Sequence, residues 1–428
     1  MGLSSALDLI SPMVVDHHIQ VTSYAVKIAE EMGLSDNEKS VVAMAAALHD
    51  IGAVSFNEEL PMSFRDDGIN RHADLGYLLL RDFPPLYDAA IVARFHHLHW
   101  NKGKGAYFGN TVVPLASHIV HLADRIAVEV YMFGNVLDKA DGVKKKVIAE
   151  RGMMFHPNVT DAFLRLADKE YFWLEALAPL TSRYEITSSA ASWNIKIDLK
   201  MMLALSEMFR IIIDFRSRMT AAHSKSVAEV ASFLGRMAGF SRNECDMLHI
   251  AGNLHDLGKL AIPVEVIEKA TSLTASEKYL VRAHSYYTFK ILSEIGGLEV
   301  IAPWAAFHHE HIDGSGYPFH LSADSLPLGS RIVAVSDIFC ALTEDRTYRS
   351  GLTLGETRTM MENMATGRKL DGNMVGLALE SFEELDRVRM KAIDDSNREF
   401  RDLQESIRKL VEDEVSIEQE FNSKQSAV

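Results

Sequence analysis

Cysteine is nearly absent from this sequence of 428 residues, which contains only Cys245 and Cys340. Two cysteines cannot build a disulfide framework, and they make thiolate ligands an unpromising basis for a metal site. Long apolar runs are absent as well. The most apolar stretch, residues 199–215, is interrupted by charged side chains. It falls short of the roughly 18 uninterrupted apolar residues that indicate a membrane-spanning helix.

Positive charge is also scarce, because the net charge is −15. A polynucleotide partner needs many Lys and Arg contacts to phosphate, so this balance argues against one. The first residues, Met-Gly-Leu-Ser-Ser-Ala, lack the charged and apolar regions of a signal peptide. We therefore expect a cytosolic protein that binds neither membrane nor polynucleotide. A small phosphorylated ligand is still compatible, because a metal cluster with nearby lysines and arginines supplies local positive charge.

Alternating strand patterns are missing too, whereas helical periodicity runs almost throughout the chain. Apolar residues from Val21 to Ala29 recur at helical spacing, and so do those from Val227 to Leu234. Thr274 to Glu277 form the pattern of a capping box, which opens a helix that carries His284. The sequence therefore predicts an all-α fold.

The two halves of the chain repeat each other. At a constant offset of 206 residues, the pairs are His17 with His223, Gly33 with Gly239, His49 with His255 and Asp50 with Asp256. At offsets of 212 to 213, the pairs are His72 with His284, His96 and His97 with His308 and His309, and Asp124 with Asp337. We therefore predict two tandem helical bundle domains, 1–186 and 223–428, joined by a linker and lead-in helix over 187–222.

The segment after Leu385 is rich in charge and carries an apolar stripe at a/d-like spacing from Phe400 to Phe421. Such a helix needs a partner surface for its apolar face. The stripe either packs on its own domain or forms a seam with a second subunit in a homodimer.

Two motifs in the second half carry the chemistry. Residues 308–318 read His-His-Glu-His-Ile-Asp-Gly-Ser-Gly-Tyr-Pro, in which adjacent imidazoles precede a tight loop. Residues 255–259 read His-Asp-Leu-Gly-Lys. Neighbouring side chains on a helix point about 100° apart, so His255 and Asp256 suit a dinuclear cluster in which Asp256 bridges two ions. Two such ions lower the pKa of a bridging water and hold a phosphodiester for in-line attack.

This combination and its spacing resemble the HD-GYP family of metal-dependent cyclic dinucleotide phosphodiesterases, over residues 218–388. The resemblance implies metal ligation by His223, His255, Asp256, His284, His308, His309 and Asp337. It implies catalytic roles for Asp256 and Lys259, and substrate contacts by Lys259, Asp313, Gly316, Tyr317, Arg346 and Arg349. It also implies a second use of the Gly-Tyr-Pro loop, in contacts with signalling proteins. Nitrogen and oxygen ligands favour Fe or Mn, and Zn, Ni or Co are compatible with the same set.

One position departs from part of the family. Some members carry a Glu four residues before the first His and use it to bind a third metal, whereas this chain has Met219. A thioether is a poor ligand for a hard cation, so we predict a site with two ions. The predicted product is the linear dinucleotide. Because the third metal is linked in the family to complete degradation, the sequence does not decide whether hydrolysis stops there.

The first half retains the whole ligand pattern, in His17, His49, Asp50, His72, His96, His97 and Asp124. Ala53 stands where the second half has Lys259, and residues 100–107 replace the Gly-Tyr-Pro loop. One interpretation is a metal-binding domain with a regulatory role and weak, altered or no phosphodiesterase activity. The other is a decayed copy whose histidines only bond each other, although burying them without a metal would be costly.

Three functions are compatible with a metal-binding domain of this type. The leading one is hydrolysis of cyclic di-GMP or 3′,3′-cyclic GMP-AMP, between which the sequence does not choose. A second is an HD phosphohydrolase acting on other nucleotides, which the Gly-Tyr-Pro loop and the segment Arg346 to Arg349 argue against. The third is a sensor or scaffold that binds the dinucleotide without cleaving it. That hypothesis would predict the loss of His255, Asp256 or Lys259, and all three are present.

Overall fold

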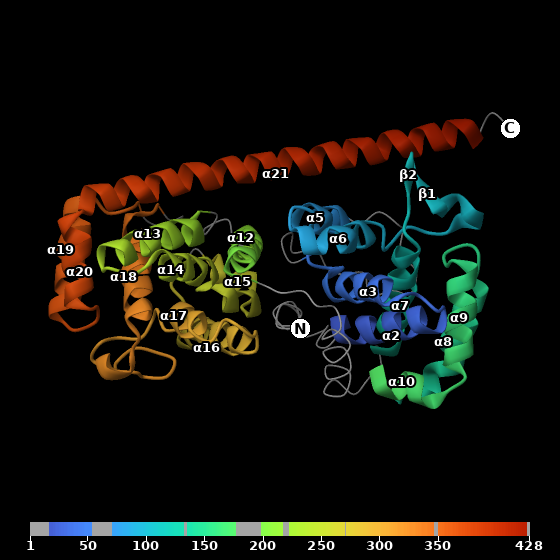
Figure 1. Cartoon of the computed structure of the whole chain (residues 1–428), viewed down its shortest axis with the longest axis horizontal. Helices are drawn as coiled ribbons and strands as arrows, with labels where there is room; N and C mark the ends of the chain where they lie inside the picture. Colours follow the sequence, from blue (N-terminus) through green and yellow to red (C-terminus); the bar gives the residue numbers. More distant parts are fainter. Residues whose placement is uncertain are drawn as a thin grey trace. The chain divides into compact units, whose positions relative to one another are not determined.

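The computed structural model describes residues 17–53, 71–131, 135–176, 198–216, 222–269, 271–345 and 350–425 (Figure 1). Their contacts define two compact units, which we call the N-terminal unit (residues 17–176) and the C-terminal unit (residues 198–402). The predicted all-α fold is confirmed, since the only strands among these residues are two paired strands of two residues each. The predicted boundary near residues 187–192 lies outside the described residues, so the limits 1–186, 187–222 and 223–428 stay predictions.

The N-terminal unit is built from helices that surround one apolar core. Its elements are α2 (His17–Glu31), α3 (Asp36–Leu48), α5 (Arg71–Leu80), η2 (Pro84–Leu86), α6 (Tyr87–Arg94), η3 (Asn101–Ala106), β1 (Tyr107–Phe108), β2 (Thr111–Val112), α7 (Leu115–Tyr131), α8 (Val136–Ala149), α9 (Pro157–Ala167) and α10 (Glu170–Ala176). The apolar face of α2, with Val21, Ala25 and Ile28 fully buried, packs against α3 and α7. The helical periodicity of the sequence therefore marks the buried face of this helix.

The C-terminal unit repeats this arrangement and extends it. Its elements are α12 (Leu199–Arg216), α13 (His223–Met237), α14 (Arg242–Leu254), η5 (Leu257–Ala261), α15 (Val264–Ile267), α16 (Ala275–Ser293), α17 (Ile301–Ala306), η6 (Ala323–Ser325), α18 (Leu328–Thr343), α19 (Leu354–Thr366), α20 (Gly372–Glu380) and α21 (Phe382–Gln425), which belongs to this unit as far as Asp402. Helix α13 packs against α14 and α18, as α2 packs against α3 and α7 in the other unit. The helices that carry the repeated motifs are therefore equivalent.

The ends of these helices are fixed by the same local chemistry in both units. Helices α3 and α14 each begin with a capping box, Ser35 with Glu38 and Ser241 with Glu244, at the same offset of 206 residues as the motifs. The predicted capping box at the start of α16 is confirmed, since the Thr274 side chain accepts a hydrogen bond from the Glu277 backbone nitrogen. Each box satisfies amide groups that a helix start otherwise leaves unpaired.

Helix α12 is the predicted lead-in helix, and it carries a buried arginine. Arg210 is 2% exposed and lies 2.9 Å from Glu207, 3.4 Å from Asp214 and 2.7 Å from Glu399 of α21. Glu399 also pairs with Lys225 of α13. These contacts hold α21 against the C-terminal unit. No helix among the described residues is long and apolar enough to cross a membrane.

Helix α21 confirms that the charge-rich C-terminal segment is helical. Its first turns pack on the C-terminal unit, where Leu385, Arg389, Ala392 and Ser396 are buried. This buried face precedes the predicted stripe. Within the stripe, Phe400, Leu403, Ile407 and Leu410 are half-buried, whereas the side chains of Ile417 and Phe421 lie outside the described set. The homodimer seam remains a prediction.

Helices α13 and α14 cross so closely that Gly252 admits no side chain. A Cβ at this position would lie 2.5 Å from the Ala228 Cα. We expect Gly252→Ala to lower the free energy of unfolding by about 1–3 kcal/mol, because neither backbone can move without separating the helices. The measurement is the urea midpoint of the full chain, followed by circular dichroism.

Gly376→Ala in α20 is the matched control, because nothing lies within 4 Å of the added methyl group. Alanine favours the helix over glycine by about 0.5–1 kcal/mol, so this variant should be slightly more stable. Equal shifts in the two variants would contradict the close approach of α13 and α14.

Arg210→Ala should destabilise the C-terminal unit by about 3–5 kcal/mol, because it leaves the buried carboxylate of Asp214 without its cation. Its control is Arg387→Ala, which breaks an exposed pair with Glu384 worth about 0–1 kcal/mol. Thermal unfolding of both variants compares the two losses. A small loss for Arg210→Ala would mean that Asp214 is neutral in the folded protein.

Candidate functional site

The centre of the site lies where α14 ends. His255 caps this helix and Asp256 follows it, at the start of the short turn η5. Asp256 is 2% exposed, and its two carboxylate oxygens face different histidines. Oδ2 lies 3.2 Å from His255 Nε2, and Oδ1 lies 3.5 Å from His284 Nε2. A carboxylate placed in this way between two imidazole groups can bridge two metal ions.

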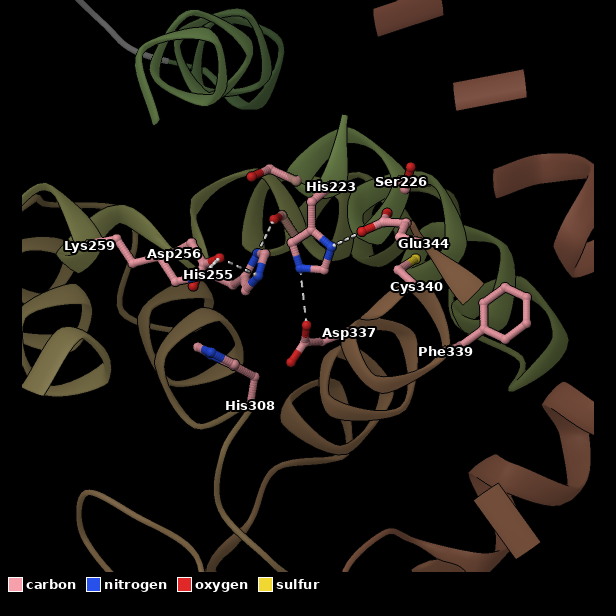
Figure 2. Close-up of polar contacts among 12 residues, drawn as sticks. His223, Ser226, His255, Asp256, Lys259, His308, Asp337, Phe339, Cys340 and Glu344 are labelled. Carbon is pink, nitrogen blue, oxygen red and sulfur yellow. Dashed lines mark hydrogen bonds and ion pairs between the residues drawn. The ribbon is translucent and has the colours of Figure 1, made fainter. Parts of the chain in front are cut away.

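The remaining predicted ligands lie near Asp256 and His255, and Figure 2 shows three of them, His223, His308 and Asp337. His223 starts α13 and lies 3.1 Å from Asp337 of α18. His308 follows α17, and its Nε2 lies 3.3 Å from Nε2 of His284. Two groups have donor atoms close enough together to share an ion: His223 with His255 and Asp256, and His284 with His308 and His309. The structure thus brings all seven predicted ligands to one place.

A glycine makes this convergence feasible. A Cβ on Gly258 would lie 1.9 Å from the carbonyl oxygen of His284. Only glycine lets the η5 turn approach α16 so closely. The Thr288 hydroxyl closes the contact, because it accepts a hydrogen bond from the Gly258 nitrogen and donates one to the His255 carbonyl. The role of Thr288 could not be predicted from the sequence, because a single threonine in a helix does not indicate a contact with another segment.

The donor set fits divalent metal ions. Nε2 of His255 is buried and makes no hydrogen bond among the described residues, as expected for a nitrogen that binds a metal. Burial lowers the pKa of His284 to about 4 and that of His309 to about 3, which keeps both imidazoles neutral. Burial alone would raise the pKa of Asp256, but His255 and Lys259 hold it well below its usual range. Neutral imidazoles and ionised carboxylates are the protonation states that ligate metals.

His223 differs from the other histidines of the site. Burial lowers its pKa, but the carboxylates of Glu344 and Asp337 outweigh burial and raise the pKa to about 10. Glu344 Oε2 lies 2.9 Å from Nδ1 of His223, on the opposite side of the ring from Asp337 (Figure 2). The contact of Glu344 with His223 could not be predicted from the sequence, because 121 residues separate the two.

A cavity of about 770 Å³ opens beside these ligands. It is lined by His223, Asp256, His284, His309 and Asp337 of the ligand set, and by Lys259, Lys269, Lys278, Thr271, Ser272, Tyr317, Ile338 and Glu344 among other residues. Lys259 Nζ lies 2.5 Å from Asp256 Oδ2. A ligand in this cavity would therefore meet the carboxylate cluster and a lysine ammonium side by side.

The Gly-Tyr-Pro loop forms part of the cavity wall through Tyr317, whose ring stacks on His309 at 4.8 Å. Gly316 packs on backbone instead, since a Cβ there would lie 2.5 Å from the His309 carbonyl oxygen. Buried Glu310, which sequence analysis missed, accepts hydrogen bonds from the backbone nitrogens of Phe319 and Leu321. This carboxylate therefore fixes the loop after the Gly-Tyr-Pro motif.

Some predicted substrate contacts are not at the cavity. Asp313 lies 3.2 Å from Lys369 and accepts a hydrogen bond from the Ser315 nitrogen. Neither Asp313 nor Gly316 is among the residues that line the cavity. Arg346, Arg349 and Met219 lie outside the described residues.

The N-terminal unit gathers its seven candidate ligands in the same way. Asp50 Oδ2 lies 3.1 Å from His49 Nε2, and Oδ1 lies 3.3 Å from His72 Nε2. His97 Nε2 lies 3.2 Å from His72 Nε2. Three groups have donor atoms close enough to share an ion: Asp50 with His72, His96 and His97; His17 with His49 and Asp50; and His49 with His96 and Asp124. Gly52 repeats the role of Gly258, since its Cβ would lie 2.0 Å from the His72 carbonyl oxygen.

Arg125 pairs with Asp124, one of the candidate ligands of the N-terminal cluster. His17 lies 3.3 Å from Asp124 Oδ1, but the Arg125 guanidinium donates to Oδ2 of the same carboxylate. Burial would raise the pKa of Asp124, yet Arg125 and His17 hold it well below its usual range. The C-terminal unit has Ile338 at this position, in the cavity wall. An internal cation therefore neutralises Asp124, whereas the equivalent Asp337 pairs with no arginine or lysine in the described part of the C-terminal unit.

Comparisons with known proteins agree with this geometry. Residues 14–129 and residues 207–374 each match an HD domain family. The chain is 28% identical over 400 residues to 3′3′-cGAMP-specific phosphodiesterase 1 of Vibrio cholerae, covering 89% of this chain and 90% of the relative. It is 33% identical to the cyclic di-GMP phosphodiesterase response regulator RpfG of Xanthomonas campestris, covering 43% of this chain and 49% of the relative.

A solved structure shares the fold. The crystal structure of a cyclic GMP-AMP specific phosphodiesterase of Vibrio cholerae (V-cGAP3) aligns with a TM-score of 0.63 and 21% identity, over 90% of this chain and 96% of the other. One family match falls in each half of the chain, and the second contains the His-Asp and Gly-Tyr-Pro motifs. The chain therefore belongs to the HD domain superfamily, with two HD domains in tandem, the second of the HD-GYP type.

Proposed function

We propose that the C-terminal unit hydrolyses a cyclic dinucleotide to the linear dinucleotide in a metal-dependent reaction. The observation that carries this proposal is the position of Asp256, whose two oxygens face two different histidines beside Lys259, at a cavity of about 770 Å³. The cavity is within the range of about 300–1,000 Å³ typical of small-ligand sites. Both domains align with a relative named as specific for 3′3′-cGAMP, so we propose 3′,3′-cyclic GMP-AMP as the first substrate to test, ahead of cyclic di-GMP.

We propose two divalent ions in this unit, with Fe or Mn favoured and Zn, Ni or Co as alternatives. Their ligands would be His223, His255, Asp256, His284, His308, His309 and Asp337, with Asp256 as the bridge. When bound, the ions supply Lewis acidity and lower the pKa of water, so that a nucleophile forms near neutral pH.

The protein side chains bind and orient the substrate. Lys259 is at the cavity, 25% exposed, where its ammonium group can turn from Asp256 to a phosphate oxygen. There it would stabilise the charge that develops when water adds to phosphorus and a ribose oxygen leaves with a proton. Tyr317, held against His309 and half-buried, would form a wall for the dinucleotide. Arg346 and Arg349 remain predicted substrate contacts. For Asp313 and Gly316, we propose a role in shaping the loop.

For the N-terminal unit we propose one metal ion, held by Asp50, His72, His96 and His97, and a regulatory role. Arg125 supports the single ion, because its positive charge already neutralises Asp124. Ala53 in place of a lysine supports weak or absent phosphodiesterase activity.

The finer partner predictions are also proposals. Phe319 follows the Gly-Tyr-Pro motif and is 37% exposed, which is compatible with contacts between this loop and a signalling protein. The homodimer, the cytosolic location and the absence of polynucleotide binding remain predictions from the sequence.

Activity assays separate the two units. Mn- or Fe-loaded protein should convert 3′,3′-cyclic GMP-AMP or cyclic di-GMP to the linear dinucleotide, and chromatography follows the products. Asp256→Ala should abolish hydrolysis, because it removes the bridging ligand. Asp50→Ala is the matched control and should retain turnover. Lys259→Ala should lower kcat by about 100- to 1,000-fold, as expected for one group that stabilises transition-state charge. Binding of both dinucleotides without turnover under every metal would support the sensor hypothesis instead.

Metal analysis tests the stoichiometry without any substrate. Asp50→Ala should hold one ion fewer per chain than the wild type. Asp256→Ala should hold two fewer, because it loses the ligand that bridges two ions. Elemental analysis of desalted protein measures metal per chain. If Asp50→Ala retains all of its metal, the proposed N-terminal site does not exist.

A further inference from the structure

Four of the five candidate histidine ligands in the C-terminal unit have a partner at Nδ1, and this partner is of two kinds. His255, His284 and His308 each place Nδ1 against the carbonyl oxygen of the residue three positions earlier, at 2.7 Å, 2.6 Å and 2.7 Å. Each of these three histidines is preceded by a helical turn that supplies the carbonyl. The contact fixes Nδ1 as the protonated nitrogen, so that Nε2 presents its lone pair to the cluster.

Among the described residues, which begin here at Ala222, no carbonyl contacts Nδ1 of His223 in this way. His223 is the first residue of α13, and its N-cap Ala222 provides no side-chain cap. Its Nδ1 instead lies 2.9 Å from the Glu344 carboxylate, while its Nε2 faces Asp337 at 3.1 Å (Figure 2). A carboxylate from another helix therefore occupies the place that a backbone carbonyl has at His255, His284 and His308.

Helix α18 supplies both carboxylates that contact His223. Asp337 and Glu344 are seven residues apart, close to two helical turns, so they project from the same side of α18. Glu344 caps the end of this helix, and its side chain is only 14% exposed. Its Oε1 is buried and makes no hydrogen bond among the described residues. The arrangement holds the Glu344 carboxylate at Nδ1 of His223 through Oε2, while Oε1 makes no other hydrogen bond among the described residues.

The N-terminal unit has a different residue at the position equivalent to Glu344. His17 starts α2 as His223 starts α13, and Asp124 faces it at 3.3 Å. Seven residues after Asp124 the sequence has Tyr131 rather than a glutamate. A carboxylate partner therefore distinguishes the centre that has Lys259 and the Gly-Tyr-Pro loop from the centre that has neither.

We propose that Glu344 is a positioning residue of the C-terminal metal centre. It holds the proton on Nδ1 of His223, so that Nε2 and Asp337 are presented together to one ion. A carboxylate at this nitrogen makes the imidazole a stronger ligand than a carbonyl does. The inference rests on the metal centre proposed above and concerns the ion that His223, His255 and Asp256 would share, with Asp337 beside His223.

Glu344→Gln tests this role, because glutamine keeps the size and a hydrogen-bond acceptor but removes the charge. We expect its affinity for the more weakly held C-terminal ion to fall by about 10- to 100-fold, as for other residues that orient metal ligands. Competition with a chromogenic chelator measures this affinity without substrate. Glu344→Ala should lose at least as much, and Glu344→Asp should recover part of the affinity. Glu362→Gln, an exposed change on α19, is the matched control.

The outcomes are separable from a failure of the proposed reaction. Reduced metal affinity in Glu344→Gln supports the role of Glu344 even if no cyclic dinucleotide is cleaved. Wild-type metal affinity in Glu344→Gln and Glu344→Ala would overturn it. A loss of thermal stability in the metal-free protein, with metal affinity unchanged, would also overturn it, because Glu344 would then only stabilise the end of α18. If hydrolysis is present, kcat should fall in Glu344→Gln more than KM rises.

Discussion

The metal centre depends on the contact between the turn after α14 and helix α16. His255 and Asp256 lie at the end of one helix and His284 in the middle of another, so the two segments must almost touch before one carboxylate can face both histidines. Gly258 permits this contact, because its hydrogen occupies a space in which any side chain would collide with the His284 carbonyl oxygen. The Thr288 hydroxyl then joins the two backbones. The same contact recurs in the N-terminal unit at Gly52.

The two units thus share one backbone arrangement around the candidate ligands and differ in the charged side chains near it. The C-terminal unit adds cationic Lys259 at the cavity and the carboxylate of Glu344 behind His223. The N-terminal unit has Ala53 in place of the lysine and puts a guanidinium, Arg125, directly on a candidate ligand. A phosphate group would meet a cation in the first case, whereas in the second the cation is already committed to Asp124. Divergence after duplication therefore changed electrostatics while the backbone contacts were kept.

The loop that gives the HD-GYP type its name is held by groups outside the motif. Glu310 accepts two backbone hydrogen bonds from the segment after Pro318, and Lys369 pairs with Asp313 before the motif. Tyr317 is left against His309 and the cavity. Burial raises the pKa of this tyrosine, so the wall that it offers to a ligand is neutral. The motif residues shape the wall, and their neighbours keep it in place.

The helical fold, the internal repeat and the set of candidate ligands could all be predicted from the sequence. Periodicity reports which face of a helix is buried, and a constant offset between His17, His49 and their counterparts His223 and His255 requires the same helix lengths in both halves. Tertiary structure alone decided which charges meet. Glu344 reaches His223 across 121 residues, and Arg210 reaches Glu399 across 189. Such pairs leave no periodic trace, because they depend on helix crossings rather than on spacing along the chain.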